Sequence, residues 1–344
     1  MSRETTPDTP PHPGRTPEMD RRDFLKRVAA ASAIAVGAGT LGLAFLDPAG
    51  PPPVPERTVL PGLGDFSVKD LPAGRPRMAV VRGSDRAAMF GQGVQALGGM
   101  EAFIRKGDSV LIKVNAAFST PAALGATTHP DLLAAVAAAC LKAGAARISV
   151  TDNPINNPES CFAISGLTGA ARQAGASLIL PRSGLFSPVT LPGAHLLRDW
   201  PVLAGAFTGV TKLIALAPVK DHARAGASML LKNMYGLLGG RRNVFHQDIN
   251  AIITELSLLV KPTLSVLDGS MTMMSNGPTG GSLSDLKATS TMVVTTDPVA
   301  ADALGAELLG RTLDDIPYIR MAQAAGAGTA DYKSLNPAYL DADA

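Results

Sequence analysis

The segment from Pro218 to His246 holds side chains whose types and spacing suit the binding of an anion. It combines lysine, arginine and histidine with two adjacent glycines, whereas the whole chain is only 17% charged. Arginines can clamp a carboxylate or phosphate through paired hydrogen bonds, and glycines let a ligand approach the backbone. The glycines could equally end a helix. The candidate ligand-binding residues of this segment are Lys220, Asn233, Gly239, Gly240, Arg241 and Arg242.

Three histidines, His129, His222 and His246, stand next to polar, glycine or proline residues at the ends of predicted elements. Histidine can act as an acid or base near neutral pH, or as a metal ligand. The spacing of the three carries no metal-binding signature, and His129 could simply cap the helix that follows it. With Lys232 and an orienting Asp152, the three histidines form the predicted catalytic set.

Beyond residue 77, short apolar runs alternate with helical patterns, which predicts an α/β fold. We expect a mostly parallel sheet flanked by helices, in one lobe or two, with a cleft at the carboxyl ends of the strands. The expected strands are 78–81, 109–114, 146–151, 177–180, 211–218, 263–267 and 289–295. The expected helices are 87–97, 130–143, 159–173, 225–238, 248–260 and 297–309.

Four of these strands end in polar side chains. Ligands of open parallel sheets bind beyond the carboxyl ends of the strands, so these residues should converge on one edge. A single polar strand end is usually only a turn, and four in one chain leave a site and simple turns equally open. To the ligand-binding set this adds Lys113, Asn115 and Asp268, and the same pattern supports Asp152, Lys220 and His222.

Composition limits the classes of function. A net charge of +2 and 4% aromatic residues argue against nucleic acid as a partner. Two cysteines are too few to hold an iron–sulfur cluster. No phosphate-binding loop or dinucleotide fingerprint is present. An anionic small molecule, or a cofactor that is anionic or carries a metal, is the ligand class that fits.

The N-terminal part predicts export of the protein. Residues 1–18 suggest a disordered tail. In residues 19–46, paired Arg21 and Arg22 and a Phe-Leu-Lys sequence precede a weakly apolar run from Val28 to Leu46, as in twin-arginine signals. This predicts the twin-arginine machinery as a partner and a periplasmic or cell-envelope location, with 28–46 as a signal or a membrane anchor. A linker at 47–76, a folded domain at 77–330 and a tail at 331–344 complete the predicted organisation.

An ordered set of sequence blocks resembles the DUF362 family, whose function is uncharacterised. The blocks are VLIKVN (110–115), TTHPDLLAAV (127–136), VTDNP (150–154), VKDH (219–222), LLKNMYGLLGG (230–240), LDG (267–269), GPTGG (277–281) and TTDPVAADALGAELLG (295–310). Some members carry an added segment with cysteine-bound iron–sulfur clusters. This chain lacks those cysteines, so the resemblance implies no cluster here.

The H-x-x-x-G feature at His222–Gly226 and the K-N…G-G feature at Lys232–Gly240 are also similar in general character to the site of nickel-pincer lactate racemases. That similarity and the residues themselves leave two classes of function open. One is an enzyme that acts on an anionic molecule, in the manner of an oxidoreductase or isomerase. The other is a non-catalytic carrier or metal-binding protein of the cell envelope, and a chaperone-like partner of another exported enzyme is a third reading.

Overall fold

The computed structural model describes residues 20–44, 60, 62–69 and 74–344. The chain divides after Arg57 into two units, each described by itself. In the first unit, α1 spans Arg21–Ala44. No helix in the described ranges combines the length and the apolar character needed to cross a membrane. The predicted tail at 1–18 lies outside the described residues, as do most residues of the predicted linker at 47–76.

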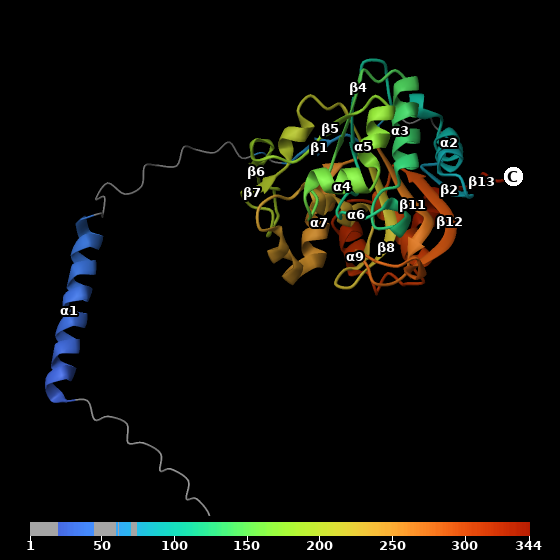
Figure 1. Ribbon diagram of the computed structural model, residues 1–344. Coiled ribbons are helices and arrows are strands. Elements are labelled where there is room, and N and C mark those ends of the chain that lie inside the picture. The colour runs from blue at the N-terminus through green and yellow to red at the C-terminus, as the bar shows by residue number, and fades with distance from the viewer. Residues whose placement is uncertain (1–19, 45–59, 61, 70–73) are drawn as a thin grey trace, which may run out of the picture. The chain divides into compact units, whose positions relative to one another are not determined.

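The second unit is built on a nine-stranded, mostly parallel sheet (Figure 1). Its strands follow the order β13-β2-β12-β11-β8-β3-β4-β5, and β9 pairs with β8. β12 and β9 run antiparallel to their neighbours, and the other pairs are parallel. The strands are β2 (Met78–Arg82), β3 (Ser109–Lys113), β4 (Arg147–Thr151), β5 (Ser177–Ile179), β8 (Lys212–His222), β9 (Gly226–Ser228), β11 (Leu264–Met273), β12 (Leu286–Thr295) and β13 (Ala338–Asp341).

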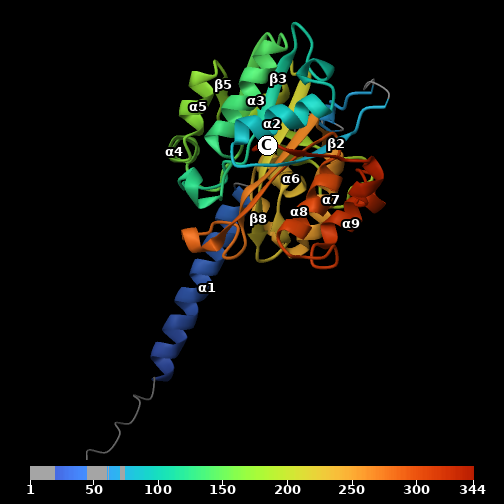
Figure 2. The same ribbon diagram turned by 90° about the vertical axis from the view of Figure 1, so that its right-hand side faces the viewer.

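The sheet separates two hydrophobic cores, because successive strand residues point to opposite faces. In β2, Met78 and Val80 belong to one core, while Ala79 and Val81 belong to the other. The core of Ala79 and Val81 is covered by α2 (Arg86–Ala96), α3 (Pro130–Lys142), α4 (Pro158–Ile164) and α5 (Leu167–Gln173). The opposite core is covered by α6 (Leu230–Asn233), α7 (Ile249–Leu259), α8 (Pro298–Leu308) and α9 (Pro317–Ala324), as Figures 1 and 2 show together. The predicted α/β fold with a mostly parallel sheet is confirmed.

Two short sheets lie outside the main one. β1 (Gly64–Asp65) pairs with β10 (Val260–Lys261), and β6 (Ser187–Val189) pairs with β7 (Trp200–Val202). β1 falls within the predicted linker, yet it already pairs with the folded unit. In the predicted tail at 331–344, β13 extends the main sheet beside β2.

Two predicted helices differ from those found. Residues 159–173 form α4 and α5, which are separated at Gly166, where φ is +80°. Residues 225–238 form β9, the short helix α6 and a 3₁₀ helix, η5 (Met234–Leu237). At Gly226, φ is +76° and an added Cβ would lie 2.3 Å from the carbonyl oxygen of Asp315, so this glycine allows a tight turn into β9. The apolar spacing of the segment concealed that turn.

The four strands with polar ends are neighbours in the sheet. β11, β8, β3 and β4 are adjacent and parallel, so their carboxyl ends share one edge. β8 is longer than predicted and extends through His222, which carries Lys220 and His222 into the strand itself. Residues two apart on a strand share a face, so these two side chains point to the same side.

Candidate functional site

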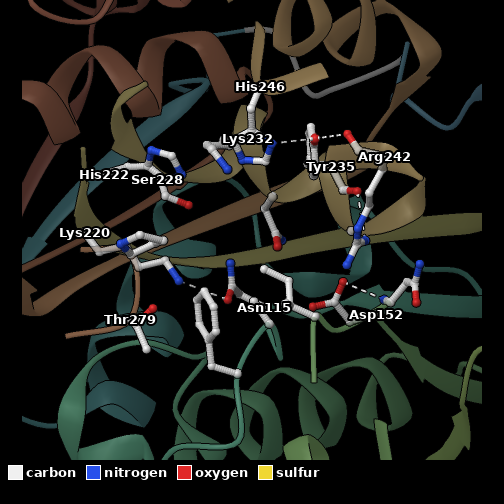
Figure 3. Close-up of a pocket in the computed structure, with 17 residues that line it drawn as sticks. Asn115, Asp152, Lys220, His222, Ser228, Lys232, Tyr235, Arg242, His246 and Thr279 are labelled. Carbon is white, nitrogen blue, oxygen red and sulfur yellow. Dashed lines mark hydrogen bonds between the residues drawn. The ribbon is translucent and has the colours of Figure 1, made fainter. Parts of the chain in front are cut away.

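A cavity of about 160 Å³ lies beyond the carboxyl ends of β3, β4 and β8 (Figure 3). Side chains from six separate segments close it, including the loop that follows β11. The lining residues are Asn115, Ala117, Phe118, Asp152, Asn153, Ile155, Lys220, His222, Ser228, Lys232, Asn233, Tyr235, Gly236, Arg242, His246, Pro278 and Thr279. We call this space the main cavity.

Beneath the main cavity, Lys113 and Asp152 form a buried ion pair, with Nζ 2.8 Å from Oδ1. Lys113 Nζ also donates to the carbonyl oxygen of Val114 at 2.8 Å and to the backbone and side-chain oxygens of Asn233 at 3.0 and 3.1 Å. Burial lowers the pKa of Lys113, and the Asp152 carboxylate opposes that shift. We call Lys113, Asp152 and Asn233 the buried floor.

Both oxygens of Asp152 are occupied within the floor. Oδ2 accepts from the backbone N–H of Ala116 at 2.6 Å, and Oδ1 accepts from that of Asn153 at 2.8 Å. A Cβ added to Gly236 would lie 2.0 Å from Asp152 Oδ1 and 2.9 Å from Lys113 Nζ. The floor therefore requires glycine at 236. The contacts of Asp152 go to Lys113 and to these two backbone N–H groups, and none goes to a histidine.

Lys220 and Lys232 contrast with Lys113, because neither forms an ion pair with a carboxylate of the described chain. Lys220 Nζ donates to the carbonyl oxygen of Ala126 at 2.5 Å and to Asn115 Oδ1 at 3.3 Å. Lys232 Nζ lies 5.0 Å from the centre of the Tyr235 ring, and no described residue accepts a hydrogen bond from it. Burial, with repulsion from neighbouring cations, lowers the pKa of Lys220 to about 7 and that of Lys232 to about 8.

The hydrogen bonds of His222 assign its tautomer. Its Nδ1 accepts from the backbone N–H groups of Arg224 at 3.2 Å and Ala225 at 3.1 Å. Burial first, and then the charge of Lys232, lower the pKa of His222 to about 3, so the ring is neutral at physiological pH. A neutral ring with an accepting Nδ1 carries its proton on Nε2. His222 therefore offers a hydrogen-bond donor to the main cavity.

His246 has the opposite tautomer. Its Nδ1 lies 3.2 Å from the carbonyl oxygen of Asn243 and 3.2 Å from Tyr235 Oη. The Tyr235 hydroxyl donates to the carbonyl oxygen of Arg242, so its oxygen can accept from His246. His246 thus donates from Nδ1, and its Nε2 retains a free lone pair. Burial lowers its pKa, which keeps the ring neutral. The two imidazoles are stacked with centroids 6.3 Å apart, and with Lys220 and Lys232 they form what we call the cationic wall.

Residues 110–307, more than half of the chain, match the family described as "Domain of unknown function (DUF362)". The chain belongs to the DUF362 family. It is also similar to thylakoid-associated protein sll1697 of Synechocystis sp., at 24% identity over 241 residues that cover 68% of this chain and 73% of the relative. No solved structure matches the chain. Every residue that lines the main cavity lies within the part of this DUF362 chain that matches the family.

The arginine and glycine pairs of this DUF362 chain lie at the mouth of the main cavity or outside it. Arg242 lines the cavity, but its guanidinium donates to the carbonyl oxygens of Tyr235, Leu238 and Pro154 at 2.8–3.3 Å. Arg241 is exposed and does not line the cavity. Gly239 and Gly240 line an adjoining hollow of about 460 Å³, which shares Arg242 and His246 with the cavity. The predicted arginine clamp is therefore not assembled.

His129 and Asp268 lie outside the main cavity and line a separate one of about 130 Å³, which we call the second cavity. His129 caps α3, with its Nδ1 accepting from the backbone N–H of Asp131 at 3.3 Å. Asp268 pairs with Arg86 Nε at 2.8 Å. The structure does not bring all three predicted histidines together, because His129 is held at the start of α3 and lines the second cavity instead. Within the described ranges, no cluster of three or more histidine, cysteine, aspartate or glutamate residues could hold a metal.

The remaining lining residues were not predicted. Tyr235 and Gly236 sit inside the predicted helix 225–238, where they read as packing residues. Ser228 becomes a neighbour of Lys220 because β9 pairs the two residues. Phe118, Asn153, Pro278 and Thr279 belong to loops. For Phe118 and Asn153 the only signal was their position just after polar strand ends, and that signal does not give side-chain direction. Pro278 and Thr279 lie in the glycine-rich segment 276–281, whose sequence suits a surface turn and a loop over the site equally.

Proposed function

We propose that this DUF362 protein binds a small organic anion, bearing a carboxylate or phosphate group, in the main cavity. The observation that carries the proposal is the pair of buried lysines, Lys220 and Lys232, without a carboxylate partner in the described chain. A buried charge is strongly unfavourable unless it is compensated, and here the ligand supplies the compensating charge. Asp152, the carboxylate that lines the main cavity, is paired with Lys113 instead.

The chemistry that fits the cationic wall is proton transfer at a carbon beside a carbonyl group. His246 Nε2 would accept the proton from that carbon as the C–H bond breaks. The electron pair would move to the carbonyl oxygen, whose negative charge the ammonium groups and the His222 Nε2–H would stabilise. Return of the proton from His246 to the carbon closes a hydrogen-exchange cycle without an added oxidant or reductant.

The same tautomers argue against His222 as a metal ligand through Nε2. Coordination would require Nδ1 to carry a hydrogen, which would then face the N–H groups of Arg224 and Ala225. Anion binding with proton transfer therefore fits this wall better than the metal chemistry of the nickel-pincer racemases.

Hydrogen–deuterium exchange tests the proposal without knowledge of the substrate. The full chain is incubated in D₂O with a panel of small carboxylic acids that carry a C–H bond beside a carbonyl, and mass spectrometry follows deuterium uptake at that carbon. We expect uptake for at least one acid, with a loss of at least tenfold in His246→Gln. An exposed histidine provides the matched control, so His195→Gln should exchange at the rate of the parent.

The carrier hypothesis gives a different outcome in the same experiment. An acid that raises the melting temperature but shows no exchange would mark the protein as a binder, and proton transfer would be refuted. If no acid or phosphate compound raises the melting temperature, the anion-binding proposal itself fails.

We also propose that residues 19–46 direct export by the twin-arginine route, which transports folded proteins and would allow a ligand to be loaded beforehand. The support is the Arg21-Arg22 pair followed by a weakly apolar run. The relative from Synechocystis sp. is named as thylakoid-associated, which is a statement about that protein. Replacing both arginines by lysine should retain the protein in the cytoplasm, as measured by cell fractionation. Unchanged export of this variant would refute the route.

A further inference from the structure

The second cavity lies on the other side of the 115–129 loop from the main cavity and shares no lining residue with it. It is enclosed by the first turn of α2, the 122–129 loop and residues within β8 and β11. Its lining residues are Arg86, Ala122, Ala123, Gly125, Thr127, His129, Pro218, Asp268 and Met271. We infer that it is a second binding site, for a carboxylate or phosphate group, with Arg86, Thr127 and His129 as donors.

Thr127 provides the first observation. Its side chain is 3% exposed, and its Oγ1 is buried without any hydrogen-bond partner in the described chain. The adjacent Thr128, by contrast, accepts from the backbone N–H of Asn115 at 2.8 Å and donates to the carbonyl oxygen of Leu216 at 3.3 Å. A buried hydroxyl without a partner is unfavourable, and native structures contain few of them. An oxyanion in the cavity would accept the hydrogen bond that Thr127 lacks.

Arg86 provides the second observation. Asp268 Oδ2 accepts from its Nε at 2.8 Å, while no described residue accepts from its two terminal nitrogens. Asp268 is itself fixed, because its Oδ1 accepts from the N–H and hydroxyl of Ser270 at 2.9 and 2.5 Å. The guanidinium is therefore held in place with its terminal N–H groups unused, an arrangement suited to bidentate binding of a planar or tetrahedral oxyanion.

His129 completes the donor set. Because its Nδ1 accepts from the N–H of Asp131, a neutral ring carries its proton on Nε2. Burial, and then the charge of Arg86, lower the pKa of His129, which favours that neutral form. Three donors of different chemistry thus line a space that holds one small group. Since Asp268 balances the charge of Arg86, hydrogen bonding rather than net charge sets the preference of this site.

Histidine NMR tests the second cavity separately from the main one. The chain has five histidines, so labelling their Cε1 atoms with ¹³C gives a countable set of signals, each assigned by a His→Gln variant. Inorganic phosphate and acetate, titrated into the full chain, present the two candidate groups. We expect at least one of them to shift the His129 signal. In Arg86→Gln and in Thr127→Val the same shift should need at least tenfold more ligand, whereas the exposed control Arg105→Gln should match the parent.

Two results would overturn the inference. One is a His129 signal that does not shift when either anion is added to about 0.1 M, a concentration at which surface charges are already screened. The other is a shift of the same affinity in Thr127→Val, which keeps the shape of the side chain and so decides the matter even if Arg86→Gln fails to fold. The signals of His222 and His246 report on the main cavity in the same spectra, so failure of the proposed function would be seen independently.

Discussion

The buried floor and the cationic wall use the same residue type for opposite purposes. In the floor, Lys113 has an ion pair with Asp152 and hydrogen bonds to Val114 and Asn233. In the wall, Lys220 and Lys232 are also buried (1% and 9% exposed, against 0% for Lys113) but have no carboxylate partner, and Lys232 has no acceptor among the described residues. Burial of a lysine therefore does not reveal its role. The completeness of its partners distinguishes the floor, where the lysine is paired, from the wall, where we propose that a ligand binds.

Removing a floor charge should give the largest effect on stability. In Lys113→Met the Asp152 carboxylate is left buried without its cation, which destabilises proteins by about 3–5 kcal/mol. Urea denaturation should show a lower free energy of unfolding by about that amount. The matched wall variant, Lys232→Met, removes a charge that has no partner and should unfold at the same or a higher urea concentration. Equal destabilisation by the two variants would abolish the distinction between floor and wall.

For ligand affinity, the wall variant rather than the floor variant should show the large effect. A hydrogen bond to a charged group contributes roughly 1.5–3 kcal/mol, so Lys232→Met should weaken anion binding by about 10- to 100-fold. Isothermal titration calorimetry with the acid that gives the largest rise in melting temperature measures this loss. Arg241→Gln is the matched control, since Arg241 is exposed and does not line the main cavity. Full retention of affinity in Lys232→Met would remove Lys232 from the site.

The affinity should also depend on pH in a defined window. The pKa values of Lys220 and Lys232 are about 7 and about 8, so both ammonium groups are largely present below pH 7 and are lost as pH rises through 8. Binding of sulfate, which stays ionised throughout, should therefore weaken by up to about tenfold per pH unit for each lysine above its pKa. Calorimetry between pH 6 and 9 checks this. Affinity that stays constant over this range would contradict the lowered pKa values.

The stability of the ligand-free protein should change in the opposite direction. Both lysines have folded-state pKa values below the ordinary value of 10.5, so the unfolded chain binds more protons above pH 7. Their contribution to the free energy of unfolding therefore rises with pH from about 7 towards 10. In urea denaturation, Lys220→Met should show a smaller rise than the parent.

The sequence predicted the fold and one edge of the site, because both depend on local pattern. Alternating apolar runs placed the strands, and polar strand ends placed Asn115, Asp152 and Lys220 at one edge. The sequence could not show that the 115–129 loop separates His129 from that edge. Nor could it show which nitrogen of His222 the backbone would occupy, since that depends on a turn concealed within an apparent helix.

Gly236 illustrates the same limit. Within an apolar run, Gly236 resembles a helix residue of low helix propensity. It is required because its backbone lies so close to the Asp152 carboxylate that a Cβ would not fit. Such requirements come from tertiary contacts that no local spacing encodes. The hydrogen-bond and ion-pair partners of the lysines also come from tertiary contacts. Those partners distinguish the floor from the wall.

Proton uptake on binding tests the central claim most directly. At pH 8, Lys232 is about half neutral and Lys220 mostly neutral in the empty cavity, given pKa values of about 8 and about 7. Calorimetry of sulfate binding, repeated in buffers of different ionisation enthalpy, counts the protons taken up. The account predicts clear uptake in the parent and reduced uptake in Lys232→Met. Binding without uptake would show that the cationic wall is not where the anion binds, and equal uptake in the variant would remove Lys232 from the site.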